Sequence, residues 1–427
     1  LTANTATGHG GAIHAAGDVT ADLSTISGNS AGGDGGGLYS AGGTHTLSSA
    51  TVAFNTATGS GGGLAQSAGA VTIGHTILSN NTAGSGNQCS GTVGTSDRNV
   101  VAAIAGCTFT PAANDSTGTG AGLVALADNG GSTETHALNG TSVALDICGT
   151  CAATDHLGIT RGASCDAGSF EAIQVQFNAA IASRAEDFGT YNVAVTIDGS
   201  NPYTATTVTV GQTGGTATLG TDYTLSNTSI TFPTGATASQ SATVTINEDD
   251  FGEGDETAIL GLSGPGGAVL GAFDTHTLTI TDNETVGITL TPTSLTVDED
   301  GSNSYQIVLD SEPTADVLVT FNDGTEADAG FASVTFTSLN WDVARNVVVS
   351  VPDNLVADGT RADSITHTVT STDLDYDGLD PTLPVTINDD DTEAIFVAET
   401  DGGTAVSEAS PGVTDSYSVV LGSAPVG

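Results

Sequence analysis

Aliphatic residues and asparagines recur together at a near-constant interval over the first ninety positions of the chain. The pairs, each three residues apart, are Leu1 and Asn4, Ile26 and Asn29, Val52 and Asn55, and Leu78 and Asn81. The asparagines are 25, 26 and 26 residues apart, and a glycine-rich run follows each of the first three. Short β-prone stretches between glycine turns at this period predict one coil of a parallel β-helix per repeat. Stacked coils would place Asn29, Asn55 and Asn81 in a ladder of hydrogen-bonded side-chain amides.

The pattern changes after residue 174 to strict alternation of apolar and polar residues. Examples are Ala205–Val210, Ser229–Phe232 and Ala242–Ile246. Such runs predict half-buried antiparallel strands, and about a hundred residues of them predict a β-sandwich. A similar pattern of alternating strands recurs, less regularly, over residues 285–391. A third copy begins near Ala394 and contains about two predicted strands.

The predicted fold class is therefore all-β, with a short right-handed parallel β-helix followed by tandem antiparallel β-sandwiches of immunoglobulin-like type. We expect β-helix coils over residues 1–110 and a disulfide-tied cap of the helix over 111–172. Sandwiches are expected over 174–284 and 285–391, and an incomplete third over 392–427. There is no initiator methionine or signal peptide, so we expect the chain to be a piece of a longer precursor.

The charge of the chain is extreme, with 49 acidic residues against five arginines and no lysine, a net charge of −44. Such a polyanion repels phosphate backbones and anionic lipid, so we expect no nucleic-acid partner. No run of about 18 apolar residues is present, and we expect no direct membrane insertion in this segment. Only 10 of the 49 acids precede residue 171. The acidic part of the chain should attract cations.

Five cysteines lie between residues 89 and 165. Only Cys148 and Cys151 have the spacing of a zinc-binding pair, so disulfides in an extracellular protein are the preferred interpretation. The pairs we expect are Cys89–Cys107 and Cys151–Cys165, which leaves Cys148 unpaired.

Two bacterial surface families resemble the first part of the chain. The paired asparagine and glycine motifs resemble the repeats of the polymorphic outer-membrane-protein family. Residues 126–138, 142–146 and 165–171 are similar to the choice-of-anchor type Q segment, with a departure at Gly158–Arg161. That segment closes β-helical regions, and an open helix end with unpaired strand edges needs a cap. The resemblance also assigns a structural role to His136.

The first sandwich resembles a Calx-β domain. The motifs are Gly214–Tyr223, Phe232 with Gly235, Ile246–Asp250, Glu253–Glu256 and Ile280–Asp282. This resemblance implies Ca²⁺ bound by carboxylates of loops at one end of the sandwich, an arrangement suited to a cation that takes six to eight oxygen ligands. The ligands it implies in the first sandwich are Glu186, Asp222, Glu248, Glu253, Glu256 and Asp282. Asn247 stands where the family prefers aspartate, so Asp249 and Asp250 could take over.

The second sandwich offers its own set of candidate calcium ligands. They are Glu299, Asp353, Asp358, Asp389, Asp390 and Asp391. The alternative is that the acids form only a solvated, repulsive surface. A uniform surface of that kind would also cover the β-helix, which has few acids. The junctions Asp282–Glu284 and Asp389–Asp391 would repel without a cation, and with one they could stiffen the connection between domains.

No catalytic constellation can be assembled from the sequence, and we expect no enzyme. Gly28–Gly32 matches the G-x-S-x-G pattern, but it lies in a repeat turn instead of the strand–turn–helix that a nucleophile needs. The predicted function is a Ca²⁺-rigidified stalk or fibre subunit, structural or adhesive, secreted or on a bacterial cell surface. Its partners would be other copies of itself, joined through open ends, or a surface receptor or glycan. The alternative is a carbohydrate-acting β-helix enzyme with accessory sandwich modules.

Overall fold

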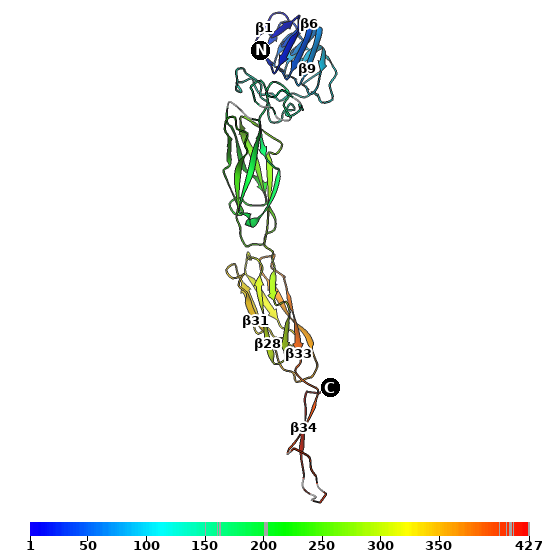
Figure 1. Ribbon diagram of the computed structural model, residues 1–427, viewed down its shortest axis with the longest axis vertical. Helices are drawn as coiled ribbons and strands as arrows, with labels where there is room; N and C mark the ends of the chain where they lie inside the picture. The colour runs from blue at the N-terminus through cyan, green and yellow to red at the C-terminus, as the bar shows by residue number, and fades with distance from the viewer. Residues whose placement is uncertain are drawn as a thin grey trace. The chain divides into compact units, whose positions relative to one another are not determined.

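The structure of the protein is a computed structural model, shown in Figure 1. It describes residues 1–149, 151–159, 161, 164–199, 204–400, 402–406, 408–409, 412 and 414–425. Within these ranges the chain is built of β-strands, with a single 3₁₀ turn at Glu186–Phe188. No helix in this part of the chain is long and apolar enough to cross a membrane. The chain divides into two compact units, of which the second consists of residues 185–187, 248–255 and 281–427.

Three parallel sheets form the N-terminal part of the first unit. One contains β2 (Ile13–Ala15), β3 (Val19–Asp22), β6 (Leu38–Ser48), β9 (Leu64–Gly74), β12 (Cys89–Thr95) and β14 (Cys107–Phe109). A second contains β4 (Thr25–Ser27), β7 (Thr51–Ala53), β10 (Ile77–Ser79), β13 (Val100–Val101) and β15 (Ser116–Thr117). The third contains β1 (Thr5–Ala6), β5 (Ser30–Ala31), β8 (Thr56–Ser60) and β11 (Thr82–Ser85). Leu38 pairs with Leu64 across β6 and β9, which lie side by side in Figure 1. Most paired residues of these two strands are therefore 26 residues apart, as the sequence repeat predicts. The three sheets fit a β-helix-like region.

The predicted asparagine ladder is present inside these coils. Asn29 Nδ2 donates to Asn55 Oδ1 at 2.8 Å, and Asn55 Nδ2 donates to Asn81 Oδ1 at 2.9 Å. Asn4 extends the ladder at one end and Gln88 accepts from Asn81 at the other. The sequence pattern did not identify Gln88, because it belongs to the same coil as Asn81 and not to the repeat.

The glycine runs beside the ladder allow close approach of successive coils. A Cβ on Gly36 would lie 2.4 Å from the carbonyl oxygen of Gly62, and one on Gly62 would lie 2.5 Å from that of Asn87. No side chain fits at such distances, so the repeat requires glycine at these positions.

Residues 118–172, here called the covering segment, lie along the side of the coils. His136 Nε2 is 2.7 Å from Ser27 Oγ in the first coil, and the Ser169 amide donates to Thr51 Oγ1 in the second. The Ala121 amide reaches Ser79 Oγ in the third. All three residues of β4, β7 and β10 are buried, because the core covers one face and this segment covers the other. These contacts lie along the side of the coils, and the cap over the helix end stays a prediction. Thr160, within the expected departure at Gly158–Arg161, lies outside the described residues.

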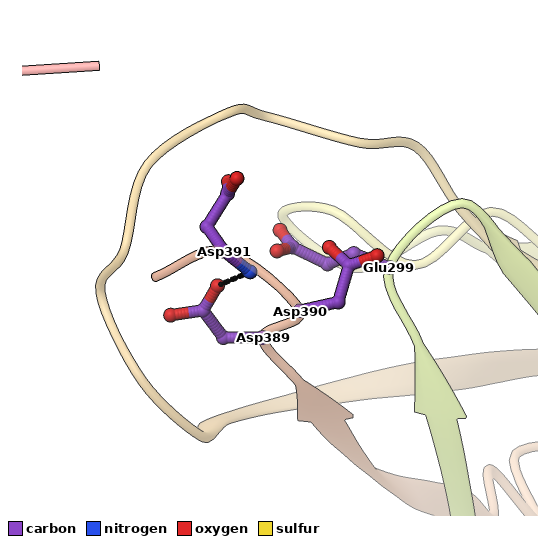
Figure 2. A group of neighbouring side chains, drawn as sticks. All are labelled: Glu299, Asp389, Asp390 and Asp391. Atoms are coloured by element: carbon purple, nitrogen blue, oxygen red, sulfur yellow. Dashed lines mark hydrogen bonds between the residues drawn. The ribbon is translucent and has the colours of Figure 1, made fainter. Parts of the chain in front are cut away.

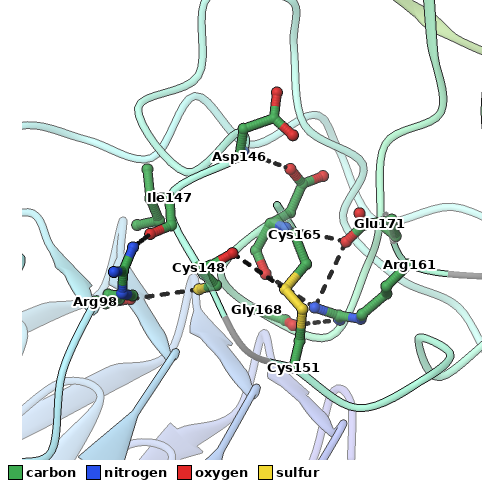
Figure 3. Close-up of a disulfide and its surroundings, with 10 residues drawn as sticks. Arg98, Asp146, Ile147, Cys148, Cys151, Arg161, Cys165, Gly168 and Glu171 are labelled. Atoms are coloured by element: carbon green, nitrogen blue, oxygen red, sulfur yellow. Dashed lines mark hydrogen bonds and ion pairs between the residues drawn. A yellow bond between two sulfur atoms is a disulfide. The ribbon is translucent and has the colours of Figure 1, made fainter. Parts of the chain in front are cut away.

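Both expected disulfides, Cys89–Cys107 and Cys151–Cys165, are formed. Cys148 is a buried free thiol whose backbone pairs with that of Cys165 (Figure 3). Burial raises the pKa of this thiol to about 12, so it stays protonated and unreactive near neutral pH.

Ten strands form the first sandwich, in two five-stranded sheets. One has β16 (Gln174–Phe177), β18 (Thr190–Asp198), β20 (Tyr223–Ser226), β22 (Gln240–Ile246) and β24 (Val269–Leu270). The other has β17 (Ile181–Ala185), β19 (Thr206–Gly215), β21 (Ser229–Phe232), β23 (Glu256–Gly266) and β25 (Thr275–Thr281). The three alternating runs that predicted strands lie on β19, β21 and β22. Their inward residues, such as Val208, Ile230 and Val244, are buried between the sheets.

The second sandwich pairs a three-stranded and a five-stranded sheet. The first has β26 (Ile288–Thr291), β28 (Gly301–Leu309) and β31 (Arg345–Val351). The second has β27 (Leu295–Asp298), β29 (Val317–Asn322), β30 (Ser333–Phe336), β32 (Arg361–Thr370) and β33 (Thr382–Asn388). Trp341, the one tryptophan of the sequence, packs against the core between these sheets.

The last two strands of the described chain are β34 (Ile395–Glu399) and β35 (Tyr417–Leu421). Ile395 pairs with Leu421 as Ile288 pairs with Leu309 in the second sandwich. The register thus repeats the first strand pair of that sandwich. Val426 and Gly427, at the end of the expected third sandwich, lie outside the described residues.

Candidate metal centres

Four carboxylates meet at one end of the second sandwich, and we call them the strand-end cluster: Glu299, Asp389, Asp390 and Asp391 (Figure 2). Strands β27 and β33 run parallel, with Asp298 opposite Asn388. Parallel neighbours end at the same edge of a sheet, so the next residues, Glu299 and Asp389, come together. The Glu299 amide donates to the Asn388 carbonyl at 3.0 Å. One carboxylate oxygen from each of the four residues lies within 4.8 Å of the others.

Backbone donors hold Asp389 in its charged form. The amides of Gly359 and Asp391 both donate to its carboxylate, the latter at 2.9 Å, and they lower its pKa. Burial and the neighbouring Asp353, Asp389 and Asp390 raise the pKa of Asp391. The cluster therefore concentrates negative charge that repels itself unless a cation is nearby.

Glu299 is the most enclosed member of the strand-end cluster. Its side chain is 0% exposed, and its Oε2 has no hydrogen-bond partner among the described residues. A buried carboxylate oxygen without a partner is costly. Its other oxygen accepts from Arg361, which also contacts Glu326 at 2.7 Å and Asp358. The structure thus assigns Asp358, one of the candidate ligands, to an ion pair with Arg361.

A second group, the junction cluster, consists of Glu186, Asp282 and Glu284. All three belong to the second unit, and their carboxylate oxygens lie within 4.8 Å of one another. Asp282 accepts hydrogen bonds from the Glu284 amide at 2.8 Å and the Gly254 amide at 2.6 Å. Burial raises the pKa of Glu186 to about 7, with further contributions from Asp249, Glu248, Glu284 and Asp282. The site set expected from the sequence lacked Glu284, although it belongs to the acidic junction that the sequence indicated.

The remaining candidates occupy separate positions. Asp222 and Glu256, in the first unit, bring carboxylate oxygens within 4.8 Å of each other. Glu248 accepts from Asn283 Nδ2 at 3.2 Å, and Asp249 accepts from the Phe251 amide at 3.0 Å.

Three further candidate ligands, Glu253, Asp250 and Asp353, belong to the second unit. The Asp250 carbonyl accepts from the Glu312 amide at 2.7 Å. Asp353 accepts from the Leu355 amide at 3.0 Å and lies close enough to raise the pKa of Asp391.

Arg361 and Glu326 are the residues that sequence reasoning missed at this end of the second sandwich. Arg361 is one of only three arginines from residue 171 onward, a segment that holds 39 of the 49 acids. The scarcity of arginine in this segment could have identified Arg361, because an arginine among many acids tends to form ion pairs with several of them. Glu326 carries no comparable signal, because its position beside Arg361 follows from tertiary packing.

The donor chemistry of both clusters is uniform. Every candidate atom is a carboxylate oxygen, the ligand type of hard cations such as Ca²⁺, and neither cluster contains a cysteine or histidine ligand. The unpartnered Oε2 of Glu299 fits a bound cation, which would complete its coordination. Magnesium demands near-ideal octahedral geometry and retains its waters, so it serves as the control cation in a test of this site.

Comparison with known proteins identifies a Calx-beta domain over residues 170–284. No curated protein matches the chain. Among solved structures, the apo form of the Calx CBD1 domain is 28% identical, covering 27% of this chain and all of its own, with a TM-score of 0.25. CBD12 from CALX1.2 is 19% identical, covering 50% of this chain and 100% of its own, with a TM-score of 0.31. The human Desmocollin-1 ectodomain is 13% identical, covering 52% and 43%, with a TM-score of 0.21.

Proposed function

We propose that the protein is an extracellular structural or adhesive protein whose sandwiches bind Ca²⁺ at the strand-end and junction clusters. The observation that carries the proposal is Glu299, a fully buried carboxylate with one unpartnered oxygen that meets three aspartates at the end of parallel strands. The Calx-beta match over the preceding sandwich supports the same chemistry.

The role of calcium in this proposal is mechanical. Carboxylates at strand ends and in the segment between sandwiches repel each other, and a divalent cation would replace that repulsion with shared ligands. The sandwiches would then act as a stiffened stalk or fibre that carries the β-helix-like region. The partners we propose are other copies of the chain or a surface receptor or glycan, and we propose no catalytic activity.

An extracellular location is part of the same proposal. Two disulfides tie the first unit, and disulfides persist in oxidising compartments. Calcium at millimolar concentration is also available outside cells, which would suit weak sites of this kind.

The proposal is tested by unfolding the complete chain while following the fluorescence of Trp341. Because this is the one tryptophan and it packs in the second sandwich, its signal reports that sandwich alone. We expect Ca²⁺ at about 100 times its dissociation constant to stabilise the sandwich by about 2.7 kcal/mol relative to EGTA. For a domain of about 100 residues this raises the midpoint by about 10–20 °C.

Two matched variants locate the effect. Asp390→Asn removes an exposed member of the strand-end cluster and should abolish most of the rise, whereas Asp342→Asn, exposed elsewhere in the same sandwich, should retain it. Equal midpoints in calcium, magnesium and EGTA at matched ionic strength would overturn the proposal.

A further inference from the structure

Arg361 stands at the centre of the acidic end of the second sandwich. It is the first residue of β32 and pairs with Ile387, so its side chain starts close to the end of β33, where the strand-end cluster begins. Its guanidinium contacts three carboxylates, those of Glu299, Glu326 and Asp358. These carboxylates come from the end of β27, from the segment after β29 and from the loop before β32.

The surroundings make Arg361 a permanent counter-ion. Its side chain is only 18% exposed, and its hydrogen bonds to Glu326 and Glu299 raise an already high pKa. The guanidinium therefore stays protonated and positively charged. Its planar group of N–H donors can hold two carboxylates at once. The buried Glu299 would otherwise carry an uncompensated charge.

The two oxygens of Glu299 differ in their partners. Oε1 accepts from Arg361, whereas Oε2 has no hydrogen-bond partner among the described residues. One oxygen of this carboxylate lies within 4.8 Å of oxygens of the three aspartates. A divalent cation bound by Oε2 would lie a few ångströms from the guanidinium, and like charges at that separation repel. The backbone pairing of β27 with β33 brings the backbones of Glu299 and Asp389 together, but it does not neutralise their carboxylates, which only a cation can do.

We propose that Arg361 is a built-in counter-ion that keeps the strand-end cluster assembled without calcium and lowers the affinity of that cluster for calcium. This inference rests on the proposed function, since it assigns a regulator to the same site. Its consequence is a sandwich that stays folded when calcium is scarce and releases the ion readily.

The test compares the complete wild-type chain with Arg361→Gln, using the fluorescence of Trp341 to follow unfolding in EGTA and across a Ca²⁺ titration. We expect Arg361→Gln to lower the midpoint in EGTA by about 10 °C, because Glu299 loses its partner. In saturating Ca²⁺ the two midpoints should converge. The Ca²⁺ concentration that gives half of the rise should fall about tenfold in the variant, because the competing charge is gone.

Two further variants keep the outcome interpretable. Arg361→Lys retains the charge but not the fork, so it should lose stability in EGTA while its calcium affinity stays near that of wild type. Arg345→Gln makes the same chemical change at the start of β31, outside the three ion pairs of Arg361, and should alter neither the affinity nor the convergence.

The outcomes separate this inference from the proposed function. If wild type responds to Ca²⁺ and Arg361→Gln loses equal stability with and without it, the inference is wrong and the proposed function stands. An unchanged midpoint of Arg361→Gln in EGTA also overturns the inference. If neither protein responds to Ca²⁺, the proposed function fails at this cluster, and a loss in EGTA alone supports only the counter-ion role.

Discussion

Individual arginines of this acidic chain contact buried carboxylates. Arg361 contacts the fully buried Glu299, and Arg161 lies 3.5 Å from Glu171 with 1% and 7% of their side chains exposed. Arg161 also donates to the carbonyl of Asp166 and, as Figure 3 shows, to that of Gly168. Removing Arg361 would leave the buried carboxylate of Glu299 without compensation, which is more damaging than losing a surface ion pair.

His45 is a polar residue in an otherwise apolar column of the β-helix-like core. It is 0% exposed, it pairs in register with Val19 and Val71, and neither ring nitrogen has a hydrogen-bond partner among the described residues. Burying unsatisfied nitrogens costs about 1–3 kcal/mol. We expect His45→Val to raise the free energy of unfolding of the first unit by about 1 kcal/mol after the smaller volume is allowed for. Calorimetry of the complete chain measures this change.

Thr46→Val is the control for His45→Val, because Thr46 is the next residue of β6 and is exposed on its outer face. It should change stability by no more than about 0.5 kcal/mol. A lower transition temperature for His45→Val would show that the imidazole makes a stabilising polar interaction, contrary to our account.

At the scale of elements, a network of buried acids orders the covering segment. Asp155, Asp166 and Glu171 are all buried, and their carboxylates accept backbone hydrogen bonds, such as that from the Ala172 amide to Asp166. Arg161 is the arginine that contacts this network among the described residues. Burial raises the pKa of Asp166 to about 7 and that of Glu171 to about 8.

The network makes the covering segment less stable at alkaline pH. A carboxyl whose pKa is raised on folding binds more protons in the folded state, so folding stability falls as pH rises from the unfolded pKa, near 4, to the folded values of about 7 and 8. We expect the calorimetric transition of the first unit to be lower at pH 8.5 than at pH 5.5. Glu171→Gln should reduce that difference, and the exposed Glu134→Gln should leave it as in wild type. An undiminished pH dependence in Glu171→Gln would contradict the assignment.

Elements defined by a local period were predictable from the sequence, and those defined by tertiary packing were not. The asparagine ladder follows from a 26-residue spacing, so Asn29, Asn55 and Asn81 could be stacked before any coordinates were known. The alternating runs predicted β19, β21 and β22 for the same reason. The cap was expected from a family resemblance, and the contacts of the covering segment with the side of the coils could not be predicted, because its sequence does not show which face of the coils it meets.

The candidate sites follow the same division. Asp389, Asp390 and Asp391 are adjacent in sequence, so their grouping was readable, and the motif added Glu299. The contact of Arg361 with Glu299, 62 residues away, depends on the parallel pairing of β27 with β33, which no local pattern encodes. Only the fold shows that Asp358 is engaged by an arginine.

At the scale of the whole molecule, acidic residues are distributed unevenly between the coils and the sandwiches, and the two parts are stabilised by different interactions. The coils are held by amide ladders, glycine contacts and a disulfide, and they contain few acids. The sandwich part of the chain contains most of the acids and concentrates some of them in clusters of oxygen ligands. We propose that the coils are stable without calcium and that calcium adds to the stability of the sandwiches.

The most direct test of this account is a calcium titration of the complete chain by isothermal calorimetry, at about 150 mM salt to screen diffuse attraction between exposed charges. We predict saturable binding of at least one ion at the strand-end cluster, undiminished by excess magnesium and lost in Asp390→Asn. Heat that does not saturate, or that magnesium and calcium produce alike, would contradict the account and leave the acids as a solvated surface.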